Sequence, residues 1–151
     1  MTIAVCLAGA TGWAGSELAA RLIPQWEIID YASDGKPDAP SGTARELVAR
    51  LARVRAPEPT IPVDRTVGER TARGATVSHS QIHSVRLPGY VIGAEIVFGM
   101  PDQRLTIRHD AGGSARPYVD GALLAIRKVA TLVGVHRGLD AVLDIEAPQE
   151  T

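Results

Sequence analysis

The stretch DYASDGKPDAPSGTARE, residues 30–46, brings together residue types that can bind an anion. Lys36 supplies a positive charge, and a proline-rich turn separates it from Gly42 and Thr43 at the predicted start of a helix. Backbone N–H groups at a helix start have no acceptor within the helix, and the helix dipole favours negative charge there. Lys36 folded back over this helix end would form a small carboxylate site. A solvated lysine before a plain capped helix is the alternative.

The sequence VCLAGATGWAGSEL is a second candidate site, because Gly9, Gly12 and Gly15 lie between a predicted strand and a predicted helix. The spacing G-x-x-G-x-x-G is a variant of the dinucleotide-binding fingerprint, whose glycines let a pyrophosphate approach the helix N-terminus. A tight strand-to-helix turn without a ligand is the alternative. Asp30 follows at nearly the distance expected of an acidic residue that binds a ribose. The parallel strands and crossover helices that should come next are not predicted, so a complete dinucleotide fold is not expected.

Hydrophobic periodicity predicts the elements that position these motifs. Strands are predicted at residues 2–9, 26–32, 81–89, 93–100 and 103–111, the last three as antiparallel runs, and helices at 13–23, 41–53 and 119–133. Thr43 and Glu46 have the spacing of a capping box for the second helix. The pattern is that of an α/β or α+β chain with a mixed sheet.

Composition excludes several classes of protein. The net charge is −1 and aromatic residues make up 4%, so nucleic-acid and membrane-surface binding are not expected. The start of the chain has no basic region, no apolar run is long enough to span a membrane, and the single cysteine cannot form an internal disulfide. A cytoplasmic protein is therefore expected.

The scattered histidines and arginines are interpreted as structural or solvated residues, and neither metal ligands nor a basic face is predicted from them. For the arginines, a charged rim around an anionic ligand is the alternative. These residues are His79, His83, His109, His136, Arg65, Arg70, Arg73 and Arg86.

The segment EIIDYASDGKPDAPSGTA resembles the signature of the dihydrodipicolinate reductase family, E-x-H-H-x-x-K-x-D-A-P-S-G-T-A. Further segments resemble the family in the proper order, across roughly residues 25–145. They are GERTARGATVSHSQIHSVRLPG, EIVFG, QRLTIRHDA, SARPYVDGALLAIR and GLDAVLDI, and IAVCLAGATGWAGSEL resembles the family's first strand and phosphate loop. The resemblance implies reduction of a cyclic imine or unsaturated dicarboxylate of the lysine pathway with NADPH or NADH.

The resemblance also implies a domain organisation. Residues 1–24 correspond to a residual dinucleotide-binding strand, glycine loop and helix, and most of the family's Rossmann domain is missing after them. Residues 25–134 correspond to the substrate-binding and oligomerisation domain, a mixed four-stranded sheet flanked by helices. Residues 135–151 correspond to a segment that returns to the nucleotide-domain side. In the family the sheets associate into tetramers, so a homo-oligomer, dimer or tetramer, is expected through the strands between residues 81 and 110.

By the same resemblance, Lys36, Ser41, Gly42 and Thr43 would hold the carboxylates of a cyclic dicarboxylate, with Arg116 as a further cationic contact. Gly9, Gly12 and Gly15 would contact the cofactor. Lys36 is also the candidate catalytic proton donor, which would require a lowered pKa.

The chain differs from the family at the histidine pair before the lysine, where it has Ala32 and Ser33. One of those histidines is thought to donate the proton, and neither alanine nor serine can do so near neutral pH. Three hypotheses follow: a shortened reductase, a non-redox cyclase, isomerase or binding protein built on the substrate domain, and an inactive, truncated oligomeric core.

Overall fold

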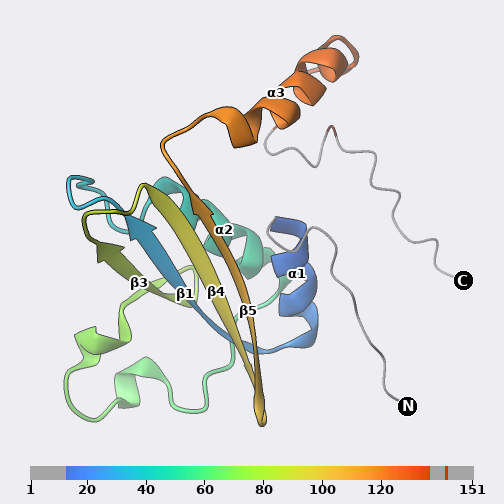
Figure 1. Ribbon diagram of the computed structural model, residues 1–151. Coiled ribbons are helices and arrows are strands. Elements are labelled where there is room, and N and C mark those ends of the chain that lie inside the picture. Colours follow the sequence, from blue (N-terminus) through green and yellow to red (C-terminus); the bar gives the residue numbers. More distant parts are fainter. Residues whose placement is uncertain (1–12, 137–141, 143–151) are drawn as a thin grey trace, which may run out of the picture. The chain divides into compact units, whose positions relative to one another are not determined.

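The computed structural model describes residues 13–136 and residue 142 (Figure 1). It consists of two units, the first extending to Gly112 and the second beginning at Gly113. The predicted strand at residues 2–9 and nearly all of the final GLDAVLDI segment lie outside the described residues. No helix in the described part of the chain is both long and apolar enough to cross a membrane.

The first unit is built on a five-stranded mixed sheet. Its strands are β1 (Gln25–Ala32), β2 (Ala75–Val77), β3 (Ser80–Arg86), β4 (Ile92–Met100) and β5 (Gln103–Ala111). They lie in the order β2-β3-β1-β4-β5, with β1 at the centre. β1 pairs with β3 in parallel, and the other neighbours are antiparallel. The connection from β3 to β4 therefore crosses the carboxyl end of β1.

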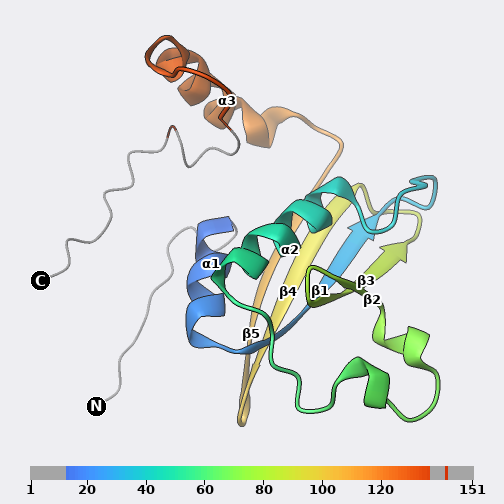
Figure 2. The same cartoon turned by 180° about the vertical axis from the view of Figure 1, so that it is seen from behind.

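Two helices, α1 (Trp13–Leu22) and α2 (Gly42–Val54), pack against one face of this sheet (Figure 2). The connection from α2 to β2 contains two short 3-10 turns, η1 (Val63–Arg65) and η2 (Arg70–Arg73). The second unit contains α3 (Arg116–Lys128) and η3 (Val129–Thr131). The helix predicted at residues 119–133 is thus present, but its regular α-helical part ends at Lys128.

The core lies between the sheet and these two helices. Alternate residues of β1 point into it, because side chains on a strand alternate between the two faces. The buried row on β1 is Trp26, Ile28, Asp30 and Ala32, so one carboxylate lies in an otherwise apolar row. The main apolar residues that meet this row are Leu47, Val48, Leu51, Ile82, Ile96 and Phe98.

Two details of the predicted sheet are wrong. The sheet has five strands instead of four, because the short β2 pairs with β3 through a turn at Ser78 and His79, both with positive φ. β3 is also not antiparallel to its neighbour β1; the two are parallel. Three residues are too few to show a period of two, and the insertion of β1 between β3 and β4 leaves no local signal in the sequence.

The predicted domain boundaries after residues 24 and 134 stay a prediction. By packing, α1 belongs with the first unit, because it contacts both α2 and β4.

Candidate functional site

The candidate anion site lies at the carboxyl end of β1, where the chain turns into α2. The turn begins with a hydrogen bond from the Lys36 N–H to the Ser33 carbonyl (3.1 Å). It continues through a cis peptide bond between Ala39 and Pro40 to the start of the helix. On the other side of the β1 end, the Leu87 N–H donates to the Ala32 carbonyl (3.2 Å), which fixes the connection from β3 to β4. Both loops beside this end of β1 are therefore tied to it.

Ser41 is the N-cap of α2. Its backbone is extended, and its Oγ accepts a hydrogen bond from the Ala44 N–H at 3.2 Å. The capping box predicted for Thr43 and Glu46 is therefore wrong, since the helix already begins at Gly42. Gly42 and Thr43 are exposed, and their N–H groups have no acceptor within the helix. Two exposed residues thus place backbone donors at the positive end of the helix dipole, next to the turn.

Asp30 holds this helix start from inside the core. Its side chain is 2% exposed, and Oδ2 accepts from the Ser41 N–H at 2.8 Å while Oδ1 accepts from the Ser41 hydroxyl at 2.6 Å. The Ser84 hydroxyl donates to Oδ2 at 3.3 Å. The Ser41 hydroxyl therefore donates to Asp30 and accepts from Ala44, which fixes its orientation.

Arg86 completes the network from the end of β3. One of its terminal nitrogens donates to Asp30 Oδ2 at 2.8 Å and to the Asp38 carbonyl at 2.6 Å. The other donates to the backbone carbonyls of Asp30 and Val85, at 3.1 and 3.0 Å. The guanidinium thus binds the β1 carboxylate and the middle of the turn at once. The interpretation of Arg86 as a solvated arginine is wrong, because its side chain is only 15% exposed.

The pKa of Asp30 reflects these contacts. Burial by itself would raise it, but the hydrogen bonds from Ser41 and Arg86 outweigh burial and hold the pKa below the ordinary value of 3.8. Asp30 is therefore an internal structural anion, with its oxygens turned towards Ser41 and Arg86. The ribose-binding spacing noted in the sequence is a coincidence.

We expect Asp30 to make the free energy of unfolding depend on pH only in acid. The folded-state pKa lies below the unfolded value, so its stabilising contribution is complete above about pH 4 and is lost as the pH falls through the folded pKa. Urea denaturation of the wild type and of Asp30→Asn across this range measures the effect. The difference in unfolding free energy between the two proteins should shrink as the pH falls, and a constant difference would contradict the prediction.

Lys36 forms an ion pair within the turn. Its Nζ lies 2.7 Å from Asp38 Oδ1, and Arg45 lies 3.9 Å from the other oxygen of the same carboxylate. The hydrogen bond from Lys36 lowers the pKa of Asp38, which keeps this carboxylate charged. Lys36 is half-buried, so its ammonium remains accessible at the surface of the turn.

The other predicted site residues are placed as follows. Ser41, Gly42 and Thr43 lie together at the start of α2, but Arg116 is an exposed residue of the second unit. Gly15 is buried in the first turn of α1. Gly9 and Gly12 lie outside the described residues. The roles of these residues stay predictions.

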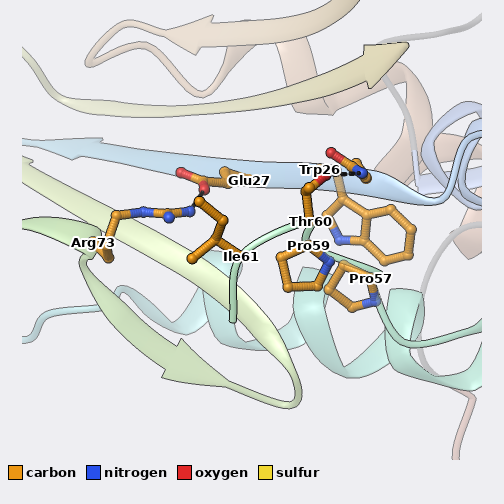
Figure 3. Close-up of a pocket in the computed structure, with 8 residues that line it drawn as sticks. Trp26, Glu27, Pro57, Pro59, Thr60, Ile61 and Arg73 are labelled. Atoms are coloured by element: carbon orange, nitrogen blue, oxygen red, sulfur yellow. Dashed lines mark hydrogen bonds and ion pairs between the residues drawn. The ribbon is translucent and has the colours of Figure 1, made fainter. Parts of the chain in front are cut away.

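A separate cavity of about 280 Å³ lies near the amino end of β1 and contains none of the predicted site residues (Figure 3). Its polar groups are already paired: the Gln25 side-chain amide donates to Thr60 at 3.2 Å, and Arg73 forms an ion pair with Glu27. Trp26 and residues of the proline-rich loop complete the wall. Because its charges neutralise each other, this cavity is a weaker candidate for anion binding than the turn at the opposite end of the strand.

Asp30 and Arg86 are the residues of this site that the sequence interpretation missed. A signal was present for Asp30, because it is the one charged residue in a row otherwise formed by Trp26, Ile28 and Ala32. A charge in a buried row requires a partner. Nothing local identifies that partner, since Arg86 follows 56 positions later.

Comparison with known proteins shows similarity over most of the chain. The family described as "Dihydrodipicolinate reductase, C-terminus" matches residues 12–143, a range that includes α1. A 4-hydroxy-tetrahydrodipicolinate reductase of Moorella thermoacetica is 48% identical over 130 residues, which are 85% of this chain and 48% of that protein. A reductase of the same name from Lactococcus lactis subsp. cremoris is 40% identical over 130 residues, 86% of this chain and 50% of that protein. The chain spans about half the length of these relatives.

A solved structure has the same fold. It is the dipicolinate-bound dihydrodipicolinate reductase from Paenisporosarcina sp. TG-14, with a TM-score of 0.76 and 34% identity. The match covers 87% of this chain and 49% of that one. The mixed sheet with its helices is therefore shared with a protein whose structure contains dipicolinate.

Proposed function

Since the chain belongs to the family of the dihydrodipicolinate reductase C-terminus, as its signature predicted, we propose that it binds a small cyclic dicarboxylate at the turn between β1 and α2. In this proposal it is the substrate-binding part of a lysine-pathway reductase, and such a role implies a cytoplasmic protein. The observation that carries the proposal is the start of α2, where the exposed residues Gly42 and Thr43 follow Ser41, which is fixed by buried hydrogen bonds.

The chemistry of the turn suits a carboxylate. The two N–H groups provide donors at the positive end of the helix dipole, and the Lys36 ammonium provides a charge on the same turn. Hydrogen bonds that involve an ionised partner are about twice as strong as neutral ones. A ligand carboxylate would share Lys36 with Asp38, or replace Asp38 while that carboxylate turns towards Arg45. A role of Arg116 in binding stays a prediction from the family resemblance.

Reduction also requires a proton donor and a hydride donor. Lys36 is the proposed proton donor, because the positions of the family's histidine pair hold Ala32, which is buried, and Ser33, which is half-buried. A nicotinamide cofactor, NADPH or NADH, would supply the hydride when bound. The described residues do not form a fold for it, because only β1 and β3 pair in parallel in their sheet. No step through the cofactor is therefore assigned to this chain, and contact with Gly9, Gly12 and Gly15 stays a prediction from the motif.

A second candidate function is non-redox: binding, cyclisation or isomerisation of the same class of dicarboxylate. Two observations favour it. Ala32 is fully buried and has no side-chain group that can donate a proton. The described residues also form no dinucleotide fold.

The first experiment is a calorimetric titration with pyridine-2,6-dicarboxylate. We expect Lys36→Ala to weaken binding about 10- to 100-fold, because a hydrogen bond to a charged group contributes about 1.5–3 kcal/mol. Lys128→Ala is the matched control, since it removes the only other lysine, at the end of α3 in the second unit. Absence of binding by the wild type, or equal binding by Lys36→Ala, would refute the proposed site.

Titrations with NADPH and NADH, followed by fluorescence, separate the two functions. Binding of a reduced cofactor supports the reductase, and dicarboxylate binding without cofactor binding supports the non-redox protein.

We further propose a homo-oligomer formed through the sheet face that α1 and α2 leave open. On the central strand β1 this face carries Ile29 and Tyr31, which are only half-buried within the chain. Light scattering on the same samples gives the assembly state, and a mass well above the 16.0 kDa of one chain is expected.

A further inference from the structure

Asp30 is a buried charge whose side-chain oxygens are engaged by other groups of the protein. An ionised carboxylate in a protein core is costly unless it is paired and hydrogen-bonded. Both oxygens of Asp30 are engaged, and within the described part of the chain its partners Ser41, Ser84 and Arg86 lie at the start of α2 and the end of β3. A buried and paired carboxylate beside the proposed anion site suggests that Asp30 has a role other than core packing.

We propose that Asp30 and Arg86 are positioning residues, which hold the turn from Lys36 to Thr43 in its anion-binding conformation without contacting the ligand. This inference rests on the proposed dicarboxylate site and deepens it by naming the residues that determine its affinity.

The first link is through Ser41. Its N–H and its hydroxyl both donate to Asp30, at 2.8 and 2.6 Å, and the same hydroxyl caps the Ala44 N–H. These three contacts fix the direction in which the helix starts. The N–H groups of Gly42 and Thr43, which follow Ser41 directly, therefore have a fixed direction before any ligand arrives. Donors fixed in advance do not lose conformational entropy when the ligand binds.

The second link is through Asp38. Arg86 donates to the Asp38 carbonyl at 2.6 Å, and the Asp38 carboxylate holds the Lys36 ammonium at 2.7 Å. Because the same guanidinium nitrogen also binds Asp30, the carboxylate–guanidinium pair connects the ammonium and the helix start. The Lys36 ammonium and the start of α2 are thereby held at a fixed separation. A carboxylate whose two oxygens bind both of them requires such a fixed separation.

Electrostatics and positioning predict opposite results for the loss of the Asp30 charge. Removal of a negative charge near an anion site would tighten anion binding if charge alone mattered. Loss of positioning would weaken it, because the N–H groups and the ammonium would have to be ordered during binding. The direction of the change therefore separates the two explanations.

The test is a calorimetric titration of the folded Asp30→Asn protein with pyridine-2,6-dicarboxylate. We expect its dissociation constant to rise about tenfold, which is the factor that corresponds to the loss of one hydrogen bond to a charged group. Glu27→Gln is the matched control, since it removes the charge of a carboxylate on the same strand that pairs with Arg73 and His83 instead of with the turn. Its dissociation constant should stay within about twofold of the wild type, because the substitution changes no cap, core contact or hydrogen bond of the turn.

Two further variants distinguish positioning from a general loss of stability. Asp30→Glu keeps the charge and both acceptors, so it should recover most of the affinity, which a role in packing alone would not predict. In a Lys36→Ala background, Asp30→Asn should have a smaller effect than in the wild type, because both residues act on one site. Hydrogen exchange of the Ser41 amide should also become faster in Asp30→Asn, since its acceptor is weakened.

The outcomes are distinct from those of the proposed function. No binding by the wild type overturns both proposals. Binding by the wild type with equal or tighter binding by Asp30→Asn overturns this inference alone and leaves the site intact. If Asp30→Asn does not fold, Arg86→Gln replaces it: weakened binding by the folded variant supports the inference, and unchanged binding overturns it.

Discussion

Replacement of Arg86 by methionine is expected to lower the free energy of unfolding by about 3–5 kcal/mol, the range for breaking a buried ion pair from one side. Methionine fills a similar volume but leaves the buried Asp30 carboxylate without its cation. It also removes the hydrogen bonds that Arg86 donates to the backbone carbonyls of Asp30, Val85 and Asp38. For a domain whose total stability is about 5–15 kcal/mol, this loss is large.

Urea denaturation at neutral pH measures this loss. Arg104→Met is the control, because Arg104 is an exposed residue of β5, and its replacement should change the unfolding free energy by less than about 0.5 kcal/mol. The double variant with Asp30→Asn should be more stable than Arg86→Met alone or nearly equal to it, since the uncompensated charge is then gone. A loss of less than about 1 kcal/mol for Arg86→Met would mean that the pair is not an essential part of the turn.

The binding motif could be predicted from the sequence because its parts are close along the chain. Lys36, Gly42 and Thr43 lie within one turn and one helix start, and the signature around them is specific. The cap of that helix was assigned to the wrong residue. A local pattern favours Thr43 with Glu46, but Ser41 is held in an extended conformation by Asp30, which lies 11 positions earlier.

The fold shows the same limit. Strand β5 was predicted at its observed bounds, because alternation is clear and the turn at Asp102, with a positive φ, separates it from β4. The order of the strands was not predictable from such patterns. β1 lies between β3 and β4, two strands that are distant from it in the chain, and this insertion buries the β1 row in a core that includes Ile82 of β3 and Ile96 of β4.

That burial also places Asp30. Its neighbours in the row, Ile28 and Ala32, are fully buried, so the strand cannot turn its other face to the core without exposing them. The apolar residues thus fix the face on which the carboxylate lies, and the carboxylate in turn fixes the helix start. Stability of the core and geometry of the site are therefore connected, but they are different properties that different variants can separate.

Phe98→Ala is the variant that tests this separation. Phe98 is the only phenylalanine of the chain, it is fully buried on β4, and its ring lies 6.0 Å from that of Trp26. We expect a loss of about 3–5 kcal/mol in the free energy of unfolding, from lost burial and the cavity left behind. Val97→Ala, next to it on the opposite face of the sheet and half-buried, is the control and should lose about 1 kcal/mol.

The dissociation constant for pyridine-2,6-dicarboxylate should respond differently from stability. At a temperature where Phe98→Ala is still folded, its dissociation constant should match the wild type, because Phe98 makes no contact with the turn that the structure describes. Asp30→Asn should instead change the dissociation constant at the same temperature. If the two variants weaken binding equally for equal losses of stability, the site depends on the rigidity of the whole sheet, and the special role of Asp30 is refuted. If only Asp30→Asn weakens it, the geometry of the turn is determined by the buried carboxylate rather than by the core around it.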